Sequence, residues 1–134
     1  MYLFKGEKHE KIIHTDKAPA AIGPYSQGVL CSGNFLYVSG QLPIVPETGE
    51  FAGEDIVSQT HQSLKNIQAI LDQAGMTLEN VVSTTIYLSD IAHFQQMNEV
   101  YATYFKENCP ARAAFQVAAL PKNALVEIQA VACQ

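Results

Sequence analysis

The sequence predicts one α+β domain, a mixed β-sheet with two helices packed on one of its faces. Its length of 134 residues suits a single domain, and no repeat, linker or low-complexity tract divides it. The apolar pattern gives the order strand, strand, helix, strand, helix, strand, strand, which contains two crossover units. The other face of the sheet is then left without helical cover.

The first part of the chain predicts a leader, a loop and a hairpin. We expect residues 1–11 to form a flexible polar leader and residues 12–134 to form the domain. Pro and Gly interrupt residues 16–27, which favours a loop. Two short apolar runs flank Ser32-Gly33-Asn34, so we expect a β-hairpin over residues 28–43.

The first predicted helix lies within residues 53–75. Glu54 and Asp55 are expected in its first turn, where the helix dipole favours acids, and Gly75 is expected to stop it. Its inward positions recur at helical spacing, namely Ile56, Thr60, Leu64, Ile67, Leu71 and Ala74.

A strand and the second helix follow. Residues 80–90 are rich in β-branched side chains and alternate as a strand does. Asp90 is placed to cap the next helix. The apolar side of that helix consists of Phe94, Met97, Tyr101 and Phe105.

Residues 110–132 predict two final strands around a Pro-Lys-Asn turn, each with one charge among small or aliphatic neighbours. Alternation predicts one core face on each strand, formed by Ala113, Phe115, Val117 and Ala119 and by Val126, Ile128, Ala130 and Ala132. The opposite faces carry Arg112 with Gln116, and Glu127 with Gln129. Such a mixed face suits a pocket better than open solvent.

Arg112 is the strongest candidate for a binding residue. An unpaired buried Arg costs several kcal/mol, so it must be paired, exposed or reserved for an anion. Its planar fork fits a carboxylate. A structural ion pair with Glu127 is the alternative. However, a simple hairpin about residue 122 would set Arg112 opposite residue 132, about 17 Å from Glu127.

The charge balance argues against nucleic-acid and membrane partners. Eight Lys and Arg against thirteen Asp and Glu give a net charge of −5, and the basic residues are scattered. Charges in the first residues do not fit a signal peptide, and no apolar run approaches membrane-spanning length. We therefore expect a cytoplasmic protein.

The cysteines predict reduced thiols. Cys31, Cys109 and Cys133 form no Cys-x-x-Cys pair and have no metal-site spacing to a histidine. An odd, dispersed set is typical of a reducing cytosol. Cys109 precedes Pro110, but no histidine is close in sequence, so packing explains it better than catalysis.

No dinucleotide, phosphate-loop, nucleophile-elbow or His-Glu-x-x-His motif is present. Three polar residues are weaker candidates, and each has an ordinary explanation. Ser39 can be a structural strand serine, Tyr25 can pack in its loop after Gly-Pro, and Asn98 can be a solvated helix residue.

Four stretches together resemble a known family: APAAIGPYSQG, SGQLP, QTHQSLKNIQAIL and above all PARAAFQVAALPKNALVEI. They are similar to the RidA/YjgF family of reactive-intermediate (enamine/imine) deaminases, from about residue 12 to the C-terminus. The resemblance implies a chorismate-mutase-like α+β fold and a homotrimer. It also implies ligand pockets in the clefts between subunits.

The resemblance further implies hydrolysis of 2-aminoacrylate and related 2-imino or 2-enamino acids to a 2-keto acid and ammonia, without metal or organic cofactor. Arg112 would hold the substrate carboxylate and Glu127 would position or activate water. Tyr25, Ser39, Gly40 and Asn98 would line the same pocket. Such a reaction needs only anchoring, a placed water and proton transfer.

This sequence departs from the family at one place, because many members have Cys where Ala114 stands, so thiol chemistry there is excluded. Two other functions stay open. One is an endoribonuclease or translation inhibitor, which the negative charge disfavours. The other is a regulator that binds small metabolites without turnover. Glu127 favours an enzyme, because a carboxylate repels an anionic ligand unless it handles water or a proton.

Overall fold

The computed structural model describes residues 10–134 and confirms the predicted α+β class. The main sheet has the strand order β3-β6-β4-β5, which are Phe35–Gln41, Val126–Cys133, Val81–Leu88 and Ala111–Gln116. β4 pairs parallel with β5 and antiparallel with β6, so the sheet is mixed. A separate ribbon pairs β1, Glu10–Ile13, with β2, Gly28–Cys31.

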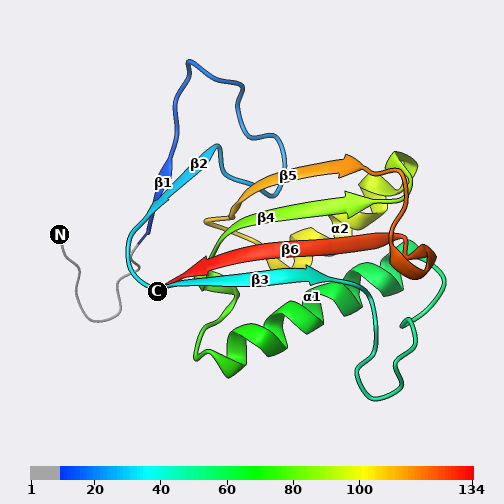
Figure 1. The fold of residues 1–134 in the computed structure, drawn as a ribbon. Helices are drawn as coiled ribbons and strands as arrows, with labels where there is room; N and C mark the ends of the chain where they lie inside the picture. Colours follow the sequence, from blue (N-terminus) through cyan, green and yellow to red (C-terminus); the bar gives the residue numbers. More distant parts are fainter. Residues whose placement is uncertain (1–9) are drawn as a thin grey trace.

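Both helices cover the same face of the four-stranded sheet (Figure 1). They are α1, Ile56–Gln73, and α2, Phe94–Tyr104, which also pack against each other. The side chains between helices and sheet are fully buried, among them Leu64, Leu71, Ile86, Met97 and Ile128. Within residues 10–134, no helix is long and apolar enough to cross a membrane.

Helix α1 begins and ends with local signals that the sequence contains. Asp55 is the N-cap, whose carboxylate accepts a 2.8 Å hydrogen bond from the Ser58 amide. Asp55 was expected in the first turn, but it lies one residue before the first helical residue, Ile56. Gly75 has φ +75°, and Met76 donates to the Leu71 carbonyl at 2.9 Å. This Schellman ending needs a left-handed residue, and glycine adopts that conformation without strain.

One further prediction in this region is confirmed, and a second is wrong in its position, because the N-cap residue of α2 is His93, which makes no side-chain capping bond. β4 follows the expected alternation, with Thr84, Ile86 and Leu88 buried toward the helices. Asp90 caps a short 3₁₀ turn, Ile91–His93, by accepting from the Ala92 amide at 2.9 Å. This turn leads directly into α2.

The predicted hairpin over residues 28–43 is wrong. β2 and β3 are strands, but β2 pairs with β1 and β3 pairs with β6. Residues 10 and 11, expected in the leader, begin β1 and supply the partner that the sequence pattern did not predict. Residues 1–9 lie outside the described residues, so the flexible leader stays a prediction.

The predicted core face is right for β6 and wrong for β5. Val126, Ile128, Ala130 and Ala132 are buried, as expected. On β5, however, Ala113 and Phe115 are exposed, while Arg112 and Ala114 lie on the side of the helices. The reason is that Arg112 pairs in a parallel register with Thr84, which is buried toward the helices, and its guanidinium donates a hydrogen bond to Asn98 of α2.

Candidate active site

Arg112 lies in a cage of aromatic rings and carries no carboxylate partner among the described residues. Its guanidinium carbon is 4.9 Å from the centroid of Tyr101, 5.5 Å from Tyr25 and 5.7 Å from Phe94. Nη1 donates a 2.6 Å hydrogen bond to Oδ1 of Asn98. A guanidinium has five N–H groups, so most of its donors are left for a ligand.

The loop before β2 brings Tyr25 to Arg112. Ser26, the next residue, is buried and donates its hydroxyl proton to the Cys109 carbonyl. Its backbone amide donates to the Pro110 carbonyl at 3.1 Å, and Ser26 bridges Ala111 at the start of β5. These bonds hold the Tyr25 segment beside the strand that carries Arg112.

Burial shapes the electrostatics of this cage. It lowers the pKa of the Arg112 guanidinium, although an arginine stays protonated at any physiological pH. Burial also raises the pKa of Tyr101 to about 12, so its phenol is neutral and hydrogen-bonds Thr84 at 2.8 Å. The cage is thus a half-buried positive charge with neutral walls, and it favours a small anion.

Glu127 lies at a second place, beside β3. It pairs in register with Tyr87 of β4, and its carboxylate crosses over Gly40 of β3. A methyl group at Gly40 would overlap that carboxylate. Ser39 precedes Gly40 and is exposed. Among residues 10–134, the side chain of Glu127 makes no hydrogen bond and no ion pair, so its carboxylate is free for a ligand or water.

The predicted site residues therefore form two groups in one chain. Tyr25, Asn98 and Arg112 make up the first, and Gly40 and Glu127 make up the second. Alternation places the groups on opposite faces of the sheet, since Arg112 pairs with inward Thr84 and Glu127 with outward Tyr87. A structural ion pair between Arg112 and Glu127 within one chain is excluded.

Two cage residues were assigned only to the core by their spacing. Phe94 and Tyr101 flank Asn98 at i−4 and i+3, positions that share one face of a helix. An amide between two aromatic rings on one helix face is the signal that could have indicated them. It was missed because rings at helical spacing are usually core.

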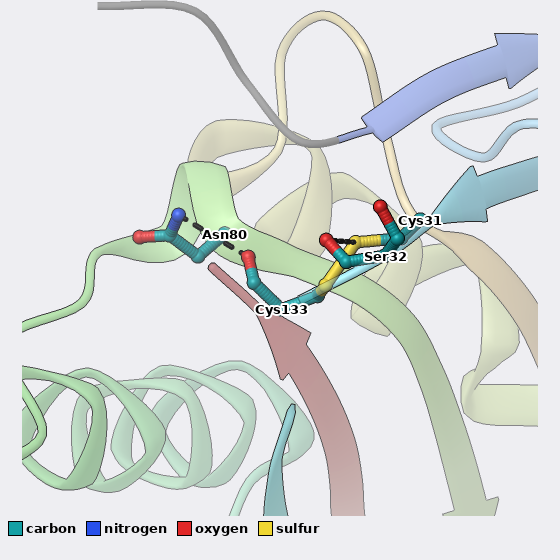
Figure 2. The surroundings of a disulfide bond; sticks show 4 residues. All are labelled: Cys31, Ser32, Asn80 and Cys133. Atoms are coloured by element: carbon teal, nitrogen blue, oxygen red, sulfur yellow. Dashed lines mark hydrogen bonds between the residues drawn. A yellow bond between two sulfur atoms is a disulfide. The ribbon is translucent and has the colours of Figure 1, made fainter. Parts of the chain in front are cut away.

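The structure corrects the expectation of three reduced thiols. Cys31 and Cys133 form a disulfide across a sequence separation of 102 residues, and Cys109 is free. Figure 2 shows the bond beside Asn80, whose side-chain amide donates to the Cys133 carbonyl at 3.4 Å. The disulfide joins the end of β2 to the end of β6. The cytoplasmic location loses the support of reduced thiols and stays a prediction.

No cluster of three or more His, Cys, Asp and Glu side chains within the described residues is placed to hold a metal ion. That the reaction needs no metal or organic cofactor stays a prediction.

The face of the sheet that the helices leave uncovered carries exposed aromatic rings. They include Tyr37, which is 76% exposed, and Phe115, which is 44% exposed.

The sequence model of the family described as endoribonuclease L-PSP matches residues 15–134. The chain belongs to the RidA/YjgF family. Its human relative, named 2-iminobutanoate/2-iminopropanoate deaminase, is 50% identical over 124 residues, which cover 92% of this chain and 90% of the relative. The recognition of a family of enamine/imine deaminases from the sequence is therefore confirmed.

Solved structures of the RidA/YjgF family have the same fold. A Thermotoga maritima protein described as an endoribonuclease superimposes with a TM-score of 0.74 at 47% identity, covering 92% of this chain and 97% of that one. E. coli TdcF with bound serine superimposes with a TM-score of 0.73 at 41% identity, covering 92% and 98%. Both relatives thus share nearly the whole domain.

Proposed function

We propose that this protein hydrolyses reactive 2-imino and 2-enamino acids of the 2-aminoacrylate type to a 2-keto acid and ammonia. Arg112 binds the substrate carboxylate, and Glu127 positions and activates the water. Tyr25, Ser39, Gly40 and Asn98 line the pocket. The chemistry uses no metal or organic cofactor and takes place in the cytoplasm.

One observation carries this proposal: Arg112 is half-buried and lacks a carboxylate partner among the described residues. A cation in such a place is costly unless a ligand neutralises it. The planar fork matches a carboxylate with two parallel hydrogen bonds. The human relative is named for two imino acids, and serine, which also carries a carboxylate, is bound in TdcF. Both relatives support a small carboxylate ligand.

The imine tautomer of the substrate is already electrophilic at its C=N carbon. A water molecule adds to this carbon while the Glu127 carboxylate accepts a proton from the water. The same carboxyl then returns this proton to the nitrogen, which gives a carbinolamine. Glu127 next moves the proton of the new hydroxyl group to the nitrogen, so that the C=O bond forms, the C–N bond breaks, and ammonia leaves. One imine and one water become one keto acid and one ammonia. Anchoring at Arg112 keeps the reacting carbon within reach of that water.

In the proposed enzyme the two half-sites come from different chains, and their places on opposite faces of one chain's sheet support this. A homotrimer with pockets in its subunit clefts would bring them together. The exposed rings Phe35, Tyr37 and Phe115 support this assembly, since a row of aromatic rings on an uncovered sheet is typical of an interface.

Cleavage of RNA is the second candidate, because the matching family model is described as an endoribonuclease. The net charge of −5 and the scattered basic residues argue against it. Binding without turnover is the third candidate. It leaves Glu127 unexplained, because a free carboxylate weakens the binding of an anion.

A coupled assay tests the proposal. A dehydratase acting on serine and threonine generates 2-aminoacrylate and 2-aminocrotonate, and release of the keto acid is followed with and without this protein. We expect micromolar protein to accelerate the release, and Arg112→Ala protein not to. Equal release in all three samples would reject the deaminase. Cleavage of single-stranded RNA by the wild type but not by Arg112→Ala would favour the second candidate.

A further inference from the structure

Tyr101 is the cage residue nearest to Arg112, and it is fully buried beneath it. Its ring centroid lies 4.9 Å from the guanidinium carbon, closer than Tyr25 or Phe94. It also packs against Phe105, with ring centroids 4.6 Å apart. Tyr101 therefore cannot reach a ligand directly, but its ring face forms the floor on which Arg112 rests.

The Tyr101 ring is itself held by Thr84. Their hydroxyls form a 2.8 Å hydrogen bond, and both side chains are buried. Thr84 is also the residue beside Arg112 in the parallel β4–β5 register. A closed loop of contacts results: Arg112 lies next to Thr84, Thr84 bonds Tyr101, and Tyr101 faces the guanidinium of Arg112.

We infer that Tyr101, fixed by Thr84, is a positioning residue that sets the plane of the Arg112 guanidinium for carboxylate binding. A long Arg side chain has many rotamers, and a bidentate contact uses only one orientation of its fork. A ring face beneath the cation favours the flat arrangement, and the bond from Nη1 to Asn98 sets the rotation within that plane. The inference rests on the proposed role of Arg112.

The first test compares Tyr101→Leu with Tyr104→Leu, the loss of the same kind of ring from the same helix, at a residue that bonds His61 and is not one of the rings around the Arg112 guanidinium. In the coupled assay, we expect Tyr101→Leu to raise KM about tenfold and to change kcat much less, because the lost contact serves binding. The NMR signals of the Arg112 side-chain N–H groups should average, which reports free rotation. Tyr104→Leu should alter neither. Equal KM values and equal spectra in the two variants would overturn the inference.

The second test keeps the Tyr101 ring in place. It therefore tests the positioning role of Tyr101 even if Tyr101→Leu does not fold. Thr84→Val and Tyr101→Phe each remove one hydroxyl of the same hydrogen bond. We expect each variant to raise KM by roughly threefold, and the double variant by no more than either, since one interaction is lost only once. No change in KM, or additive changes, would show that Thr84 does not act through Tyr101.

The Arg112→Ala variant, measured in the same assay, distinguishes a failure of the proposed function from a failure of the inference about Tyr101. If it turns over substrate normally, the role of Arg112 is wrong and the inference about Tyr101 fails with it. If it is inactive while the Tyr101 and Thr84 variants keep the wild-type KM, the proposed function stands and only the positioning role is overturned.

Discussion

Arg112 and Glu127 lie on opposite faces of the four-stranded sheet, with β4 between the strands that carry them. Arg112 pairs with Thr84 of β4 and turns toward α2, whereas Glu127 pairs with Tyr87 and turns away from the helices. Neither has an oppositely charged partner among the described residues. Two such charges on separate faces support the proposed assembly, in which the faces of different chains meet.

Activity should require the planar guanidinium of Arg112 and not only its positive charge. Arg112→Ala should lower kcat/KM for an imino acid by about 100-fold, since a charge pair with hydrogen bonds is worth about 3 kcal/mol. Arg112→Lys should recover only part of that loss, because a point charge cannot form the bidentate contact. Steady-state kinetics in the coupled assay measure both variants. Full recovery with Lys would refute the bidentate role.

Gly40 should be required for the position of Glu127. In Gly40→Ala the new methyl group overlaps the Glu127 carboxylate, which must move. We expect kcat to fall by about 100-fold, because a shift of about 1 Å in a reacting group has that effect. Gly28→Ala is the control, since a Cβ there meets only Ile13 at an ordinary 3.7 Å. If Gly40→Ala keeps the wild-type kcat, Glu127 does not act from this position.

The exposed rings of the open sheet face should hold the trimer. Sedimentation of the wild type should give a trimer at micromolar concentration. Tyr37→Glu buries a charge in the interface and should yield monomers without activity. Gln73→Glu, on the exposed end of α1, is the control and should remain trimeric. A monomeric wild type would contradict the assembly.

The Cys31–Cys133 disulfide should stabilise the chain by closing a long loop. Cys133→Ser should lower the free energy of unfolding by about 2–4 kcal/mol, measured by urea titration without reductant. With reductant, wild type and variant should differ much less. Thiol titration of the unfolded, unreduced protein should find Cys109 alone. Three titratable thiols under those conditions would show that the bond does not form.

Elements with strong local patterns could be predicted from the sequence, whereas pairings between distant segments could not. The period of α1 and the alternation of β4 are local, so both were predicted. The partner of β2 is the earlier strand β1, whose first two residues were expected in the polar leader, so a hairpin was wrongly expected. The disulfide spans 102 residues, and spacing says nothing about such a pair.

For the candidate site, too, local patterns predicted the residue types, whereas contacts between distant segments could not be predicted. The residue types at positions 112 and 127 indicated chemistry, because charges among small residues on a strand need an explanation. Alternation could not say that the Arg112 face of β5 turns toward the helices, since the parallel register with β4 decides this. The aromatic cage depends on the packing of α2 against β5, which no local pattern contains.

The proposed active site takes its two halves from different chains, and subunit exchange tests this most directly. Arg112→Ala and Glu127→Ala trimers, each inactive alone, are mixed in equal amounts and allowed to exchange. In a cyclic trimer, a cleft is intact when one chain brings Arg112 and its neighbour brings Glu127, so about a quarter of clefts should be intact. We predict recovery of about that share of wild-type activity. Mixed trimers, verified by mass, that remain inactive would contradict a site shared between chains.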